Sequence, residues 1–113
     1  MRDHSELTLR NQKDFNNVYN RGNSQGSKFV VVLYKKNDTG TTRTAFVASK
    51  KVGNSVVRNR ARRLMKESYR NFSKKVVQGY DIIFVARNTL HDIKEDDVRR
   101  AMYGAVRAAG LFN

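Results

Sequence analysis

The residues best suited to chemistry in this sequence are cations, and most of them lie in one short segment. Residues 56–70 read VVRNRARRLMKESYR, with six arginines and lysines against a single acid, Glu67. The planar guanidinium of arginine binds phosphate oxygens through two parallel hydrogen bonds, and lysine binds them as a point charge. Asn59 adds a group that can hydrogen-bond to sugars or bases. The chemistry indicated is recognition of a polyanion.

Residue types that catalyse reactions are scarce. The two histidines, His4 and His91, have no partner at a catalytic or metal-ligating spacing, and the chain has no cysteine. Glu95, Asp96 and Asp97 fit the first turn of a helix better than a metal site, because acids there oppose the positive end of the helix dipole. We therefore expect no catalytic residue and no metal site in the protein itself.

The charge is large and concentrated. The chain has 113 residues and a net charge of +13, and residues 50–75 hold ten basic residues against one acid, a net +9. Clustering of one sign predicts a nucleic-acid partner more strongly than an anionic lipid or a merely solubilising face. The length predicts one domain, residues 1–113. The longest apolar run, residues 29–34, is too short to span a bilayer, so we expect no membrane partner.

Hydrophobic periodicity predicts where the elements lie. Asn11 should cap a short helix that Gly22 ends, residues 22–27 should form a loop, and strands 28–36 and 43–51 should pair as a hairpin. Residues 80–87 are apolar at almost every position, which predicts a central strand with both faces covered. A last helix should start near Ile93 and end at Gly110.

The basic segment itself is predicted to be a helix, capped by Asn54 or Ser55. At 100° per residue, its core-facing stripe consists of Val57, Ala61, Leu64, Met65, Ser68 and Phe72. The opposite face carries Arg58, Asn59, Arg62, Arg63, Lys66 and Arg70, with Arg60 at the border. Like charges four residues apart each cost a few tenths of a kcal/mol. A helix that keeps like charges together on one face despite this cost is typical of a functional site.

Other proteins share such a charge pattern. The run RNRARR is similar to the basic region of a leucine-zipper factor, but a turn and a strand follow it here in place of a heptad coiled coil. From the residues alone the chain is an α/β domain that binds RNA or DNA. A ribosomal or other structural RNA-binding protein, and more weakly a DNA-binding factor, remain alternatives.

The central stretch resembles the protein subunit of bacterial ribonuclease P. The match is SKKVGNSVVRNRARRLMKESYR (residues 49–70), with Leu9, Phe15, Val18 and Gly22 before it and YDIIFVAR (residues 80–87) after it. Lys66 stands where the family often has arginine, which keeps the charge but loses the bidentate fork. Tyr19 stands where phenylalanine is usual, which keeps an aromatic ring.

The resemblance implies a small, ribosomal-protein-like α/β sandwich. It would have a central sheet and three helices, the basic one in a left-handed β-α-β crossover. The protein would be an accessory subunit of the cytoplasmic endoribonuclease that removes the 5′ leader from precursor tRNA. The RNA subunit, with bound Mg²⁺, would be the catalyst. The partners would be that RNA and precursor tRNA, with no small-molecule substrate.

The resemblance also implies residue roles. The main contacts to the RNA subunit would come from Arg58, Asn59, Arg60, Arg62 and Arg63. That surface would be extended by Lys50, Lys51, Asn54, Lys66 and Arg70. Phe15 and Tyr19 would line a cleft for the leader, core packing being the alternative for both rings. Tyr34 could join them if its face of strand 28–36 is exposed, but the alternation of that strand does not say which face is core.

Overall fold

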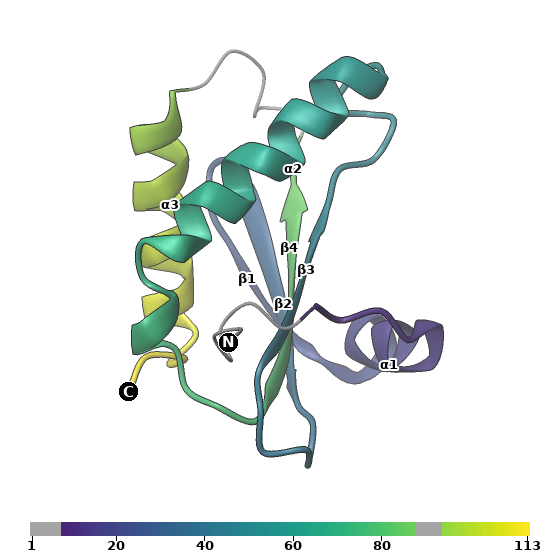
Figure 1. Ribbon diagram of the computed structural model, residues 1–113, viewed down its shortest axis with the longest axis vertical. Helices are drawn as coiled ribbons and strands as arrows, with labels where there is room; N and C mark the ends of the chain where they lie inside the picture. Colours follow the sequence, from purple (N-terminus) through teal and green to yellow (C-terminus); the bar gives the residue numbers. More distant parts are fainter. Residues whose placement is uncertain (1–7, 88–93) are drawn as a thin grey trace, which may run out of the picture.

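The computed structural model describes residues 8–87 and 94–113. The elements are α1 (Gln12–Arg21), β1 (Asn23–Gly26), β2 (Val30–Lys36), β3 (Arg43–Val47), α2 (Ser55–Arg70), the short 3-10 helix η2 (Ser73–Lys75), β4 (Tyr80–Ala86) and α3 (Glu95–Ala108). The strands form one sheet in the order β1-β2-β4-β3. Helices α2 and α3 cover one face of it and α1 covers the other (Figure 1). The predicted α/β sandwich is confirmed.

Strand β4 lies inside the sheet, as its nearly continuous apolar sequence predicts. It pairs antiparallel with β2 and parallel with β3. Ile82, Ile83 and Phe84 are fully buried, because helices pack on both faces. Burial on both sides removes the alternation of polar and apolar residues that a half-exposed strand would show.

Two strand predictions are wrong. Strand β4 lies between β2 and β3, so residues 28–36 and 43–51 do not pair as a hairpin. Hydrophobic patterns locate strands but carry little information about their partners. The predicted loop at residues 22–27 contains β1, which pairs antiparallel with β2. Because β1 is a largely exposed edge strand of polar residues and glycine, it has no hydrophobic signal.

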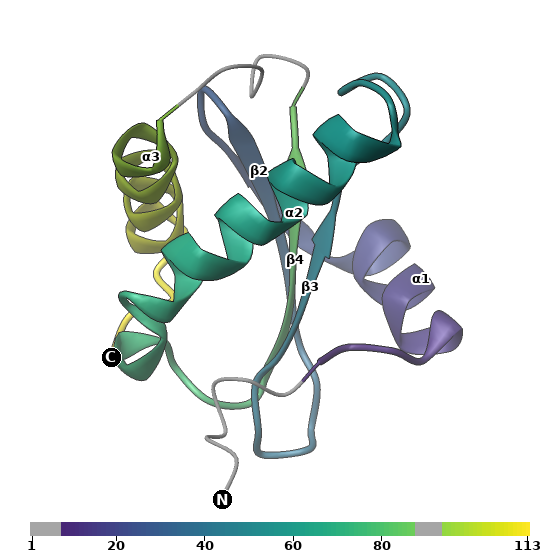
Figure 2. The ribbon, with the colours of Figure 1, turned by 45° about the horizontal axis from the view of Figure 1, so that its top comes forward.

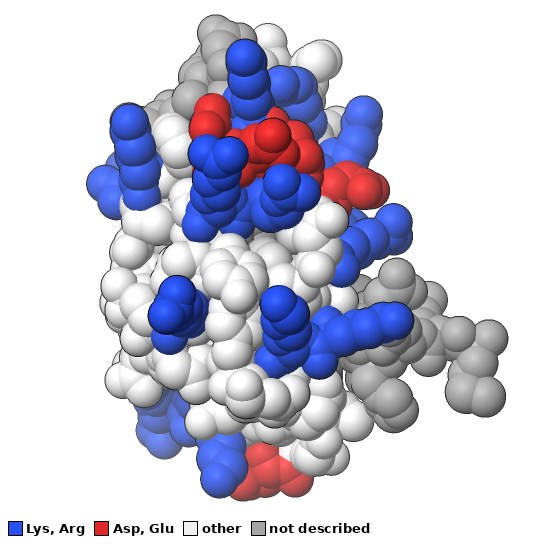
Figure 3. Space-filling view, turned by 90° about the vertical axis from the view of Figure 1, so that its left-hand side faces the viewer, with Lys and Arg blue, Asp and Glu red and all other residues white. Residues whose placement is uncertain are grey.

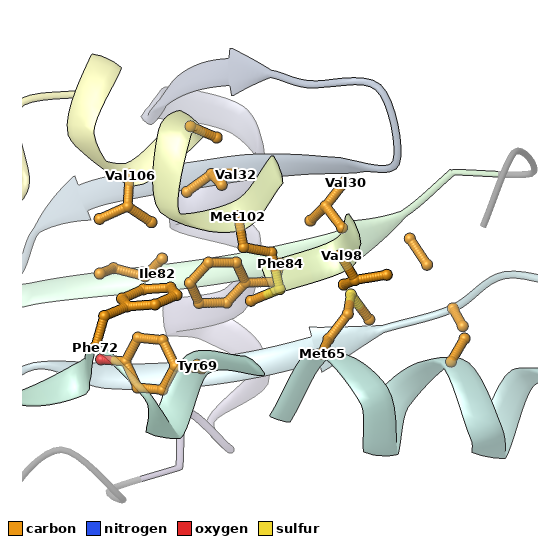
Figure 4. Packing of buried hydrophobic residues seen from close by; sticks show 14 of the residues in the cluster. Val30, Val32, Met65, Tyr69, Phe72, Ile82, Phe84, Val98, Met102 and Val106 are labelled. Carbon is orange, nitrogen blue, oxygen red and sulfur yellow. The ribbon is translucent and has the colours of Figure 1, made fainter. Parts of the chain in front are cut away.

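The main core lies between the sheet and the helices α2 and α3. Figure 4 shows Met102 of α3 beside the ring of Phe84 of β4, and Met65 of α2 beside Val98 of α3. The ring of Tyr69 lies 5.3 Å from that of Phe84. A smaller core on the other face joins α1 to the sheet through Leu9, Val18, Ala45 and Ile83. The two cores hold α1 and α2 on opposite sides of the edge strand β3.

Helix α2 connects the parallel strands β3 and β4. In Figures 1 and 2 it crosses in front of the sheet while β4 runs upward and lies to the left of β3, which makes the crossover left-handed. About 98% of such crossovers are right-handed. The residues alone therefore predict the wrong hand, and the hand implied by the family resemblance is confirmed.

The predicted helix ends agree with the structure. The side chains of Asn11 and Asn54 each accept a hydrogen bond from a first-turn backbone N–H, at 2.8 and 3.0 Å. Gly110 directly follows the C-cap of α3 with φ of 75°, a conformation that glycine adopts without strain. The predicted start near Ile93 lies outside the described residues. No helix within the described residues is long and apolar enough to cross a membrane.

Candidate nucleic-acid interface

Helix α2 has one buried side and one cationic side, as predicted. Its buried residues are Ala61, Met65, Ser68 and Tyr69. Val57 and Leu64 are half-buried against the same core, and Phe72 is buried just beyond the helix. Tyr69 is the buried residue that the predicted core-facing stripe of this helix did not include. With this side fixed in the core, the cations lie on the rest of the helix. Arg58 and Arg62 are half-buried, and the exposed ones are Arg60, Arg63, Lys66 and Arg70.

A cleft of about 510 Å³ lies between α2, β3 and the chain that leads into α1. Its basic wall consists of Arg62, Arg63, Lys66 and Arg70. Its floor consists of Thr44, Ala45, Phe46, Val47, Tyr69 and Ser73. Its remaining wall consists of Thr8, Leu9 and Phe15. The cleft therefore combines four cations with apolar and aromatic surface.

The rings of Phe15 and Tyr19 stack on each other at the α1 side. Their centroids are 5.3 Å apart with an interplanar angle of 28°. Phe15 packs against the small core and lines the cleft, whereas Tyr19 is 47% exposed and continues the aromatic surface outward. Partial burial raises the pKa of the Tyr19 phenol above its ordinary value. The phenol is therefore neutral at physiological pH and does not repel phosphates.

An ion-pair network that sequence reasoning missed ties α1 to the sheet. The guanidinium of Arg43 donates two hydrogen bonds of 2.8 Å to the carboxylate of Asp81 on β4 and one of 3.2 Å to Asp14 on α1. The hydrogen bond with Asp81 is the main reason that the pKa of Arg43 lies above its ordinary value. The signal in the sequence was a charged residue, Asp81, at the start of a buried strand.

The other predicted RNA-binding residues surround the start of α2. Lys50 and Lys51 are exposed in the connection from β3, and Asn54 caps the helix. Arg58 is half-buried and Arg60 is exposed. These residues extend the basic surface from the cleft toward the N-terminal end of α2.

Asn59 holds one of the arginines in place. Its side-chain oxygen accepts a hydrogen bond from Nη2 of Arg62, one turn further along α2. Glu67 pairs with Arg70 at 3.5 Å, and both side chains are more than half exposed, so this ion pair adds little to stability. Within the described part of the chain, Arg63 and Lys66 have no acidic partner. They are the cations of the cleft most available to a phosphate.

Tyr34 does not lie in the cleft. It packs with Val30 and Val32 on the face of β2 that α2 and α3 cover. Leu33 points to the other face, where it packs against the small core under α1. Both faces of β2 are thus occupied by helices, and the structure does not bring Tyr34 together with Phe15 and Tyr19.

The acids of α3 form ordinary helix-end interactions. Glu95, Asp96 and Asp97 occupy its first turn, as predicted, and Asp96 pairs with Arg99 at 2.8 Å. Residues 8–87 and 94–113 contain no group of three or more His, Cys, Asp and Glu side chains that could hold a metal ion. The first-turn acids of α3 are therefore explained by the helix end.

Comparison with known proteins shows which family the chain belongs to. The model of the Ribonuclease P family matches residues 4–110. The chain belongs to the ribonuclease P protein family. It is 42% identical over 109 residues to the ribonuclease P protein component of Clostridium botulinum (strain Loch Maree / Type A3), covering 96% of this chain and 98% of that relative.

Solved ribonuclease P proteins share the fold. The Staphylococcus aureus protein aligns with a TM-score of 0.85 and 26% identity, over 95% of this chain and 98% of that one. The Thermotoga maritima protein aligns with a TM-score of 0.81 and 25% identity, over 91% and 97%. The role of the ribonuclease P family is removal of the 5′ leader from precursor tRNA, and this chain is a protein subunit of that kind. The ribosomal-protein and DNA-binding alternatives are set aside.

Proposed function

We propose that the protein binds the ribonuclease P RNA through the basic side of α2 and holds the 5′ leader of precursor tRNA in the cleft. The observation that carries this proposal is the composition of the cleft, where Arg63 and Lys66 face Phe15 across the floor of β3. Single-stranded RNA is usually held in this way, by a positive groove along the backbone and aromatic rings under the bases. A surface that bound RNA by charge alone would need no aromatic ring.

The leader would run along the cleft from α2 toward α1. Its phosphates would lie against the basic wall, and a base would stack on the exposed ring of Tyr19, which Phe15 supports from behind. The floor of the cleft is largely apolar and offers few groups that discriminate between bases. Binding should therefore tolerate many leader sequences, as stacking does.

The RNA subunit would occupy the rest of the basic surface. Arg58, Arg60 and the lysine pair before α2 would contact its phosphates. Arg62, held by Asn59, would present its guanidinium in a fixed direction, which reduces the entropy lost when it forms a bidentate contact. One surface would thus contact both RNAs and bring the leader close to the catalyst.

Catalysis would belong to the RNA and its Mg²⁺. The described residues provide no metal cage. The protein would neutralise phosphates near the cleavage site and so lower the concentration of Mg²⁺ that the RNA requires. The cytoplasm, where tRNA is processed in bacteria, would be its location.

Reconstitution tests the proposal. The RNA subunit alone should cleave precursor tRNA only at high Mg²⁺, and addition of the protein should shift the Mg²⁺ dependence to lower concentration. The protein without RNA should cleave nothing. Specific 5′ cleavage by RNA-free protein, or an unchanged Mg²⁺ dependence in the complex, would contradict this division of labour.

A further inference from the structure

A second hollow, of about 460 Å³, lies between the end of α2 and α3, and we name it the α3 hollow. It is lined by Asn71, Phe72, Lys75, Arg99, Arg100, Tyr103, Gly104 and Arg107, none of which lines the cleft. Figure 3 shows the α3 side of the molecule, where basic side chains stand around an uncharged centre and acids gather toward the end at which α3 begins. The volume lies within the range of about 300–1,000 Å³ that small ligands occupy.

The rim of the α3 hollow is cationic. Arg100 and Arg107 are exposed, and within the described part of the chain neither has an ion-pair partner. Arg99 is the exception, since it pairs with Asp96. Arg100, Tyr103, Gly104 and Arg107 follow the i, i+3, i+4, i+7 spacing that places them on one helix face. That face therefore presents two available arginines on either side of an aromatic ring.

The ring of Tyr103 packs against two other aromatic rings. Phe72 and Phe112 pack against it with centroids 5.7 and 4.8 Å away. The ammonium of Lys75 lies over the ring, 5.6 Å from its centroid. An exposed cation–π contact contributes about 0.5–1 kcal/mol, whereas a stacked base contributes about 1–3 kcal/mol. A base could therefore replace the ammonium, which would then be free to contact the phosphate.

Gly104 keeps the surface beside this ring open. It is exposed in the interior of α3, and a Cβ placed there would meet no atom within 4 Å. Glycine at such a position costs about 1 kcal/mol of stability relative to alanine. Neither a positive φ nor a close neighbour accounts for it. Its structural consequence is open surface beside Tyr103.

We propose that the α3 hollow is a second RNA-binding site, which takes one unpaired nucleotide of the ribonuclease P RNA. The base stacks on Tyr103, and the flanking phosphates contact Lys75, Arg100 and Arg107. The proposal rests on the proposed function, because it assumes that structured RNA as partner. An acidic peptide would satisfy the arginines but leave the aromatic face unused, so RNA is the better match.

Matched variants at one position test the site. Gly104→Gln fills the hollow with a neutral side chain that favours helix, whereas Gly104→Ala leaves it open. Gly104→Gln should weaken binding of the RNA subunit about fivefold or more, as expected for one lost stacked base, and Gly104→Ala should bind like wild type. Arg107→Gln should weaken binding more than Lys36→Gln, which removes one charge from the exposed end of β2. Equal affinity of the two Gly104 variants would overturn the inference.

Directed cleavage separates this site from α2. Because the chain has no cysteine, Ala108→Cys and Val56→Cys each provide a single attachment point for an iron chelate that cuts nearby RNA. Val56 is 75% exposed at the start of α2, and Ala108 is exposed one turn beyond Gly104. Each chelate should cut the RNA subunit in its own discrete region.

The outcomes distinguish the two proposals. Cleavage from position 56 alone would overturn the α3 hollow and leave the α2 interface standing. Cleavage from neither position, together with lost binding, would contradict the proposed function itself. Binding of a polyglutamate peptide that Gly104→Gln weakens, with RNA binding unaffected, would assign the hollow to a protein partner and overturn the inference.

Discussion

The ring of Tyr19 offers the sharpest test of leader binding, because its structural and functional contributions can be separated. Phe15 is a poorer choice, since it lines the cleft and also packs in the small core. Tyr19→Leu removes a ring that is 47% exposed and stacks on Phe15 at 5.3 Å. An aromatic pair contributes about 0.5–1.5 kcal/mol beyond burial, and half of this ring is already solvated. We expect the free energy of unfolding to fall by about 1 kcal/mol.

The expected effect on RNA binding is larger and selective. Loss of one stacked base costs about 1–3 kcal/mol, which weakens binding about 5- to 150-fold. The measurement is the affinity of the reconstituted complex for precursor tRNA and for mature tRNA, which has no leader. Tyr19→Leu should weaken only the first. Tyr19→Phe keeps the ring and removes the hydroxyl, so it should bind both tRNAs like wild type.

The alternative is that Tyr19 only supports Phe15 and the fold. In that case Tyr19→Leu would lower the melting temperature and weaken the binding of precursor and mature tRNA by the same factor. Equal losses on the two substrates would refute the leader contact. A selective loss that Tyr19→Phe also shows would instead assign the contact to the hydroxyl and contradict stacking.

Two further predictions concern charge. Arg63→Ala together with Lys66→Ala removes two exposed cations from the cleft. The affinity of the reconstituted complex for precursor tRNA should fall, and the slope of log affinity against log salt should shrink by about one to two. An unchanged slope would mean that neither side chain contacts phosphate. Arg43→Met leaves the carboxylate of Asp81, whose side chain is 6% exposed, with the 2.8 Å hydrogen bond from Asn37. Thermal unfolding should show a loss of about 3 kcal/mol, and full stability in this variant would show that the network is dispensable.

Local features of this fold follow from the sequence, and long-range ones do not. The basic helix, its asparagine cap and the buried strand β4 are each encoded within a few turns or residues, so periodicity and capping rules predict them. Strand partners depend on residues distant in the chain. The polar strand β1 pairs with β2 without any hydrophobic signal of its own, and β3 joins β4 rather than its neighbour in sequence.

Part of the candidate site can likewise be predicted from local sequence, and part depends on the fold. The residue types and 3.6-residue period predict the basic wall of the cleft, because all its members lie on one helix. The floor on β3 and the opposite wall at Phe15 come from other parts of the chain, and the link from Arg43 to Asp14 and Asp81 depends on three separate elements. Only the fold brings these residues together.

The hand of the crossover decides whether the cleft has two walls. For the observed strand order and directions, a right-handed connection from β3 to β4 would place α2 on the other face of the sheet, the face that α1 covers. The left-handed connection places α2 opposite α1, with the edge strand β3 between them (Figure 2). The exposed flank of α2 and the aromatic side of α1 then face each other across that edge. The uncommon hand is therefore what gives the basic helix an opposite wall and so forms the cleft that we propose for the leader.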